Sequence, residues 1–335
     1  GTVSGTSISF GSAGTFKNDD SRSMVIAYDS NAQKVVVAFR DRNNSYYGTG
    51  VVGTVSGTSI SFGTTTVFES SNSNHYSIAY DANAQKVVVA YSAADVGTAI
   101  VGTVSGTGIS FGSSATFESG QTLDIVAVYD ANAQKVVIAY RDSGDSSAGK
   151  AIVGTVSGTS ISFGTEVAFQ DPQGYDIAAA YDANAQKIII SYKDGGNSDY
   201  GTAIVGTVSG TSISFSSDAV FKTSAVQECA SAYDSTAQKV VTAFKDNGNS
   251  DYGTAVVMTS SSTSTNLTSE NYIGIAEYAA ADTETATVLI KGGVSTTQSS
   301  LTPGQTYFVQ TDGTIGTSAD SPSVTAGTAV TSTKL

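Results

Sequence analysis

A basic residue followed by aspartate recurs at one position of this chain, and asparagine and tyrosine follow it in three of the four copies. Carboxylate, amide and cationic groups beside an aromatic ring can hydrogen-bond sugar hydroxyls and stack on a sugar ring. The candidate ligand-binding residues are therefore Arg40, Asp41, Tyr47, Arg141, Asp142, Lys193, Asp194, Asn197, Tyr200, Lys245, Asp246, Asn249 and Tyr252. The alternative is an ion pair between neighbouring repeats, which contributes only about 0–1 kcal/mol when exposed.

Two of these loops also gather oxygen-bearing side chains of the kind that Ca²⁺ prefers. The two sets are Asp194, Asn197 and Asp199, and Asp246, Asn249 and Asp251. Their spacing matches no standard calcium loop. We therefore predict no cofactor and no metal site, with Ca²⁺ as the alternative.

Catalysis has less support than binding. A hydrolytic site needs unique, convergent groups, whereas nearly every polar residue here belongs to a repeated set. The only histidine, His75, has no counterpart in the other copies, and no Ser-His-Asp arrangement can be built from it. We predict no catalytic residue and expect that the protein is not an enzyme.

The candidate residues belong to a repeat of about fifty residues, a period typical of solenoids, propellers and arrays. The segment GTVSGTSISF begins at Gly1, Gly53, Gly154 and Gly206, and with one serine changed to glycine at Gly102. The second copy contains four short, β-branched or aromatic runs, namely Tyr76 to Tyr80, Lys86 to Tyr91, Thr98 to Val104 and Gly108 to Phe111. Four antiparallel strands per repeat are typical of a propeller blade.

Five copies predict an all-β, five-bladed propeller. The first copy begins near its fourth strand and the last copy stops after its third. We therefore expect Thr6 to Phe10 to pair with Thr254 to Met258 and close the ring, which removes exposed sheet edges. The Tyr76 to Tyr80 type is rich in small residues, so we expect it to be the innermost strand.

This strand order places the nearly invariant DANAQ and SGT turns on one face. The loops that differ between copies, Arg40 to Gly48 and its counterparts, lie on the other face. The segments that cross from blade to blade lie there as well. Variation on one face of a rigid scaffold is typical of binding loops, although unconstrained loops would vary in the same way.

The repeat array, residues 1–258, is followed by a serine and threonine tract, residues 259–265, that reads as a linker. Residues 266–335 do not repeat and predict a small β-sandwich-like module. Its strand candidates are Tyr272 to Ala276, Ala286 to Lys291, Thr306 to Gln310 and Val324 to Val330. The abrupt start within a repeat suggests that an N-terminal part precedes Gly1.

Composition limits the partners. The net charge of -13 and the pI near 4.3 argue against nucleic acid, which would need a basic stripe. The chain has no run of 18 apolar residues, so we expect no membrane insertion. The single cysteine, Cys229, excludes an internal disulfide framework.

Two segments resemble a known family. Asn266 to Val294 and Leu301 to Leu335 are similar to a C-terminal module of fibre or structural proteins in marine, cyanophage-like tailed phages. The repeat, with YDANAQKVVVAY and GTAIVGTVSGTSISFG, resembles the arrays that precede this module. The resemblance covers essentially the whole chain and implies a virion surface protein, either a tail fibre or spike or a capsid fibre or decoration. It supplies no established binding residues.

These observations predict a non-enzymatic virion surface protein that contacts the host through the variable face. The expected partners are a host cell-surface glycan or protein and, through the C-terminal module, other virion proteins. A homo-oligomer is expected by analogy with phage fibres. The alternative is an extracellular or cell-surface lectin or adhesin that binds glycans.

Overall fold

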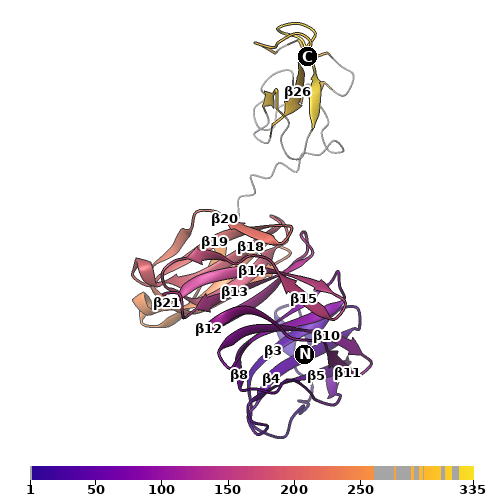
Figure 1. Cartoon of the computed structure of the whole chain (residues 1–335), viewed down its shortest axis with the longest axis vertical. Helices are drawn as coiled ribbons and strands as arrows, with labels where there is room; N and C mark the ends of the chain where they lie inside the picture. Colours follow the sequence, from indigo (N-terminus) through magenta and orange to yellow (C-terminus); the bar gives the residue numbers. More distant parts are fainter. Residues whose placement is uncertain are drawn as a thin grey trace. The chain divides into compact units, whose positions relative to one another are not determined.

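The computed structural model describes residues 2–259, 275–276, 288–289, 294–296, 298–310, 314–318 and 324–335. The chain divides into two compact units, Gly1–Ser260 and Ser261–Leu335 (Figure 1). The division falls in the predicted linker, of which only Thr259 is described. Over the described ranges the chain is all-β apart from two short 3-10 turns, η1 (Gly195–Asn197) and η2 (Asn247–Asn249). This part contains no helix long and apolar enough to cross a membrane.

Each repeat forms an antiparallel sheet, which we call a blade, with its strands in chain order from an inner strand outwards. The inner strands are β3 (Ser21–Asp29), β8 (Ser73–Asp81), the second part of β12 (Ala115–Asp130), β17 (Gly174–Asp182) and the second part of β21 (Ala219–Asp234). The second strands are β4 (Lys34–Asp41), β9 (Lys86–Ala93), β13 (Lys135–Asp142), β18 (Lys187–Asp194) and β22 (Lys239–Asp246). The third strands are β5 (Tyr47–Ser56), β10 (Val96–Ser105), β14 (Ala148–Ser157), β19 (Tyr200–Ser209) and β23 (Tyr252–Met258).

The outer edge of each of the first four blades is divided between two short segments. The second half of the third strand pairs with β6 (Ser59–Phe62), β11 (Gly108–Phe111), β15 (Ser160–Phe163) or β20 (Ser212–Phe215). The first half pairs with an outer segment, which is β7 (Thr66–Glu69), β16 (Val167–Gln170) or the first part of β12 or β21. The sequence predicts the first of these segments but not the second, which leads into the inner strand of the next blade.

The invariant turn between inner and second strands is built by its aspartate. In the third blade the Asp130 carboxylate accepts hydrogen bonds from the backbone amides of Asn132 and Ala133, both at 2.9 Å. Gln134 has a positive φ of 55°, as does the corresponding glutamine of every copy. Asx side chains cap tight turns in this way, so the conserved DANAQ composition reflects turn geometry.

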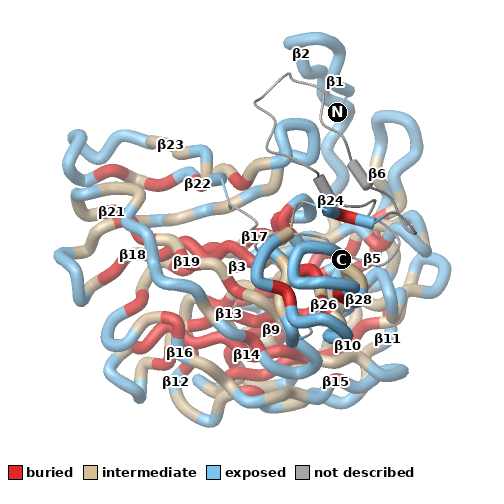
Figure 2. Tube along the Cα trace, turned by 90° about the horizontal axis from the view of Figure 1, so that it is seen from above, coloured by how far each residue is buried: buried red, intermediate tan, exposed pale blue. Residues whose placement is uncertain are grey.

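The second and third strands form the core because the blades pack against one another on both faces. Val87 to Tyr91 are fully buried in β9, and such continuous apolar runs are typical of strands covered on both sides. Neighbouring inner strands contact each other from β3 to β8, β12, β17 and β21, as expected for the innermost position. Figure 2 shows buried positions concentrated in the middle blades, with β1, β2 and much of β23 exposed.

The predicted pairing of Thr6 to Phe10 with Thr254 to Met258 is wrong. Strand β2 (Ser7–Ser9) pairs with β1 (Thr2–Ser4) in an N-terminal hairpin, and β23 pairs with β22. The repeat explains the error, because in every copy the SISF strand pairs with the GTVS residues that precede it, and in the first copy these begin at the N-terminus. The structure therefore shows five blades without a closed ring.

The described parts of the second unit contain five short strands. β24 (Ile275–Ala276) pairs with β25 (Val288–Leu289), and β26 (Thr306–Val309) pairs with β27 (Ile315–Gly316) and β28 (Thr325–Thr328). Leu301, Tyr307, Ala329 and Leu335 form a small core. Four of these strands lie within the predicted ones and β27 was not predicted. The sandwich-like architecture stays a prediction.

Candidate functional site

Every inner strand contains a β-bulge near the end that carries the variable loops. Two consecutive residues of the inner strand there lie opposite a single residue of the second strand, and the first of the two has a positive φ in all five blades. We call these the bulge residues: Ser23 (φ 49°), His75 (50°), Asp124 (47°), Asp176 (49°) and Glu228 (56°). None is glycine, although this backbone region favours glycine. Bulges redirect side chains next to binding sites, and strained backbone clusters at such sites.

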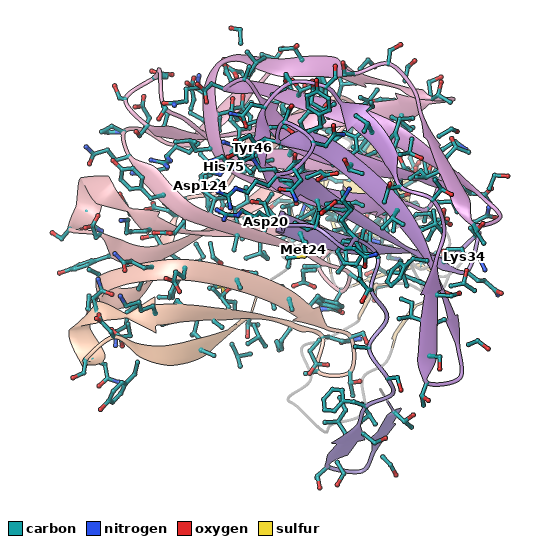
Figure 3. The ribbon with its side chains drawn as sticks, turned by 90° about the horizontal axis from the view of Figure 1, so that it is seen from below. Asp20, Met24, Lys34, Tyr46, His75 and Asp124 are labelled. Carbon is teal, nitrogen blue, oxygen red and sulfur yellow. The ribbon has the colours of Figure 1, made fainter. Side chains whose placement is uncertain are left out.

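A basic residue lies beside the bulge in four of the five blades. Arg40, Arg141, Lys193 and Lys245 are paired with the inner-strand residue immediately before the bulge residue. In the second blade this position is Ser92, which is buried. In Figure 3 the bulge residues His75 and Asp124 lie near Tyr46, whereas Lys34, which directly follows the first DANAQ-type turn, lies well away from them. The variable face therefore presents different polar groups on one repeated backbone.

The third and fourth blades contribute the most extensive set of contacts, which we call the Tyr175 cluster: Asp124, Arg141, Tyr175, Asp176 and Lys193. Arg141 Nε lies 2.9 Å from Asp124 Oδ2, and the Asp176 amide donates to the same oxygen at 3.3 Å. The Arg141 guanidinium lies 5.0 Å and the Lys193 ammonium 4.8 Å from the centre of the Tyr175 ring. Cations at this distance from an aromatic face are attracted by its quadrupole.

The remaining basic residues are also held by neighbours. Arg40 donates to Asn72 Oδ1 at 2.6 Å, and its guanidinium lies 4.3 Å from the centre of the Tyr46 ring. Lys245 donates to Gln227 Oε1 at 3.2 Å. These contacts fix the positions of half-buried cations and leave polar groups at the rim. Such a surface can donate and accept hydrogen bonds with a polar, largely uncharged ligand.

The four candidate aspartates are separated from the basic residues that precede them. Consecutive strand residues point to opposite faces of a sheet, and Asp41, Asp142, Asp194 and Asp246 are buried. Asp194 Oδ1 accepts from Asn197 N at 3.1 Å and from Gln170 Nε2 at 2.7 Å, and burial raises the pKa of this carboxyl. Asp41 pairs with Lys17 at 2.9 Å. The aspartates therefore organise the loop and are not available to a ligand, which corrects the sequence-based proposal for these four residues.

The remaining candidates are the asparagines and tyrosines of the same loops. Asn197 and Asn249 end the 3-10 turns η1 and η2, and Tyr47, Tyr200 and Tyr252 begin third strands. The rings that lie beside the basic groups are instead Tyr46 and Tyr175. No group of three or more His, Cys, Asp or Glu side chains arranged for a metal occurs in the described part of the chain.

Sequence reasoning missed Tyr175 and the bulge residues because they lie in crossing segments that align poorly between copies. One signal was available. The bulge residue is always the last but one residue of a crossing segment, and its type changes in most copies while the following strand keeps its pattern. The crossing segments end at Met24, Tyr76, Ile125, Ile177 and Cys229.

His75 gives the site a pH dependence. Burial lowers the pKa of this imidazole below its usual 6.5, although the nearby Asp124 carboxylate opposes the effect. The unfolded chain therefore takes up the proton at higher pH than the folded protein, so stability is lost as pH falls below about 6.5. We expect the drop in Tm between about pH 7 and about pH 5 to be smaller in His75→Asn, because asparagine tolerates left-handed backbone. Parallel Tm curves for the two proteins would contradict this.

Comparison with known proteins identifies no family: no family model matches the chain, and no curated protein matches it. Several solved structures are similar. The SapL1 lectin in complex with alpha methyl fucoside aligns with a TM-score of 0.46 and 13% identity, over 70% of this chain and 76% of that chain. A mutant of AofleA from Arthrobotrys oligospora gives 0.45 and 13%, over 69% and 65%. A protein of unknown function from Dyadobacter fermentans gives 0.46 and 10%, over 73% and 84%.

Proposed function

We propose that this protein is a non-enzymatic recognition protein whose variable face binds glycans on a host cell surface. The observation that carries the proposal is the series of bulge residues. The same strained backbone is kept in five blades while its side chain changes from serine to histidine, aspartate and glutamate. A strained conformation that is repeated with different polar side chains fits a surface selected for contact with a ligand.

The chemistry of the Tyr175 cluster supports a sugar as the ligand. It combines carboxylate acceptors, cationic donors and an aromatic ring within one group of contacts. Its two carboxylates and two cations balance in charge, and the net charge of the chain is -13. Both features favour a neutral glycan over a polyanion.

We also propose that the protein is carried on a virion and that its five blades form a closed propeller. The first proposal rests on the resemblance of the repeat and C-terminal segments to phage fibre proteins. The second would bring all five variable loops around one axis. The virion location is tested by labelling intact virions with an antibody to this chain. A particle-associated signal supports this location, and the absence of a signal would favour a free lectin.

Glycan binding is tested with the full chain on an array of bacterial surface glycans. We expect Tyr175→Ala and Arg141→Ala to weaken binding at least about tenfold, the size of effect expected for central interface residues. Lys34→Ala is the matched control, because Lys34 lies at the start of β4, beside the first DANAQ-type turn and away from the variable face (Figure 3). Equal weakening by the control, or an array without any signal, would refute the proposal.

A further inference from the structure

The first four blades meet their successors through the same set of contacts. The inner-strand tyrosine of each later blade accepts a hydrogen bond from a backbone amide in the DANAQ turn of the blade before it. The four bonds are Asn31 to Tyr80 (3.2 Å) and Asn83 to Tyr129, Asn132 to Tyr181 and Asn184 to Tyr233 (each 3.1 Å). The equivalent fifth pair would be Thr236 and Tyr28. Tyr28 is 57% exposed.

The outer segments also make a contact in the first four blades that is missing in the fifth. In each of the first four blades a phenylalanine of this segment covers a glycine in the third strand, leaving no room for a Cβ. Such a Cβ would lie 2.5 Å from Phe68 at Gly48, 2.6 Å from Phe117 at Gly97, 2.6 Å from Phe169 at Gly149 and 2.5 Å from Phe221 at Gly201. The corresponding glycine of the last blade, Gly253, has open space around it. The uncovered glycine identifies a missing outer segment.

The chain contains that segment at its other end. By the repeat, residues 14–17 correspond to β7, and Phe16 is already seated on the first blade, 5.1 Å from Phe39 and 5.5 Å from Phe62. Lys17 likewise pairs with Asp41, as Lys222 does with Asp246 in the last blade. Residues 11–20 form no strand, so the edge that would pair with a third strand is free.

Exposed apolar side chains mark both ends of the array. On the first blade Met24 is 56% and Ile26 65% exposed. On the last blade Val257 is 62% exposed, whereas its equivalents Val52 and Val101 are fully buried. Residues that are buried at the inner junctions are therefore uncovered at the two ends, as expected for surfaces that lack their partner.

We propose that these two ends join within one molecule. The edge of β23 pairs with residues 14–17 in the register Gly253 with Lys17, Thr254 with Thr15 and Ala255 with Gly14, as Gly201 pairs with Lys222 in the preceding blade. Phe16 then covers Gly253, and the Tyr28 hydroxyl accepts a hydrogen bond from the Thr236 amide. The partner of β23 comes from the same chain, because both ends belong to one short array. Each end therefore meets the other at an effective concentration in the millimolar range.

One position limits how far this interface extends. The glycine that follows SISF fits closely against the next SGT turn at Gly11, Gly63, Gly112 and Gly164, but the fifth equivalent is Ser216. Its Cβ would collide with the backbone of that turn. The joined ends therefore comprise the inner strands, β23 and residues 14–17, and exclude the outer hairpins.

Gly253→Ala tests this inference with Gly201→Ala as the matched control. In a joined molecule both alanines meet a phenylalanine ring, and we expect each to lower Tm by about 4 °C or more. In an unjoined molecule an alanine at Gly253 lies in open space and raises Tm slightly, since it restricts the unfolded chain. A neutral or stabilising Gly253→Ala beside a destabilising Gly201→Ala would overturn the inference.

A cysteine pair tests the register and the occupant. Cys229→Ser removes the native thiol, whose pKa burial raises to about 12. In that background Thr15→Cys with Thr254→Cys should form a disulfide within one chain under oxidised glutathione. The control is Val220→Cys with Thr202→Cys, the equivalent pair that the structure already shows. Formation of dimers linked between chains, or of no bond while the control pair forms one, would overturn the inference.

Discussion

Lys150→Thr lowers the free energy of unfolding by about 3–5 kcal/mol, because it leaves a buried carboxylate without its cation. Lys150 Nζ lies 2.7 Å from Asp142 Oδ2, 3.0 Å from Asp145 Oδ2 and 3.1 Å from Glu166 Oε1. Lys150 and Asp142 are both buried. Urea unfolding of the two proteins measures the loss.

The repeat supplies a rescue variant. Threonine occupies the position of Lys150 in the other four copies, so the substitution itself is compatible with the strand. In the first and last blades the corresponding aspartates, Asp41 and Asp246, pair with Lys17 and Lys222. Each of these lysines lies in the segment that leads into the inner strand of that blade. In the segment that leads into the third blade, the residue equivalent to Lys17 and Lys222 is Glu118. We therefore expect Glu118→Lys to restore much of the stability of Lys150→Thr, and failure of the double variant to recover would contradict this account.

The pH dependence separates lost charge from lost packing. Burial alone would lower the pKa of Lys150, but the hydrogen bonds that its ammonium donates to Asp142, Asp145 and Glu166 outweigh this effect and raise the pKa above 10.5. The stability that it contributes is therefore fully present at neutral pH and is lost only in strong alkali. Burial also raises the pKa of Glu118. The deficit of Lys150→Thr should shrink as pH falls and Glu118 becomes protonated, because less negative charge is then left near the site, whereas a packing defect would persist.

The repeat predicted the blade architecture well because its signals are local. Short β-branched runs, Asx turns and SGT turns specify the strand order and the two faces without knowledge of distant contacts. The outer segment was missed because in two of the four copies it is a strand of only four residues, and in the other two it runs without a break into a crossing of variable composition. The closing pair was wrong because strand composition does not specify register, which here follows from the hairpin turn.

The site was predicted only in part for a related reason. The Arg-Asp and Lys-Asp dipeptides are adjacent in sequence, yet the pleat of a strand directs the two side chains to opposite faces. Asp142 is buried towards Lys150, whereas Arg141 contacts Asp124 and Tyr175. Tyr175 comes from the next blade, so the contact depends on tertiary packing that one repeat does not encode.

Phe169→Ala should also lower the free energy of unfolding by about 3–5 kcal/mol, the cost of removing a buried phenylalanine. The ring is buried and lies 5.3 Å from Tyr192 and 5.7 Å from Phe215, between the outer edge of the third blade and the core of the fourth. It also covers Gly149. Its loss opens a cavity at a junction between blades, and urea unfolding again measures the effect.

Phe221→Ala is the matched control, because Phe221 holds the same position one repeat later. Its ring lies 5.2 Å from Phe244, and within the described residues no second ring partner is found. Aromatic pairs add about 0.5–1.5 kcal/mol each beyond the burial of their area. Phe221 is also only half-buried, so its loss should cost about 2 kcal/mol. Equal losses at the two positions would mean that the stability of a blade junction does not depend on this aromatic layer.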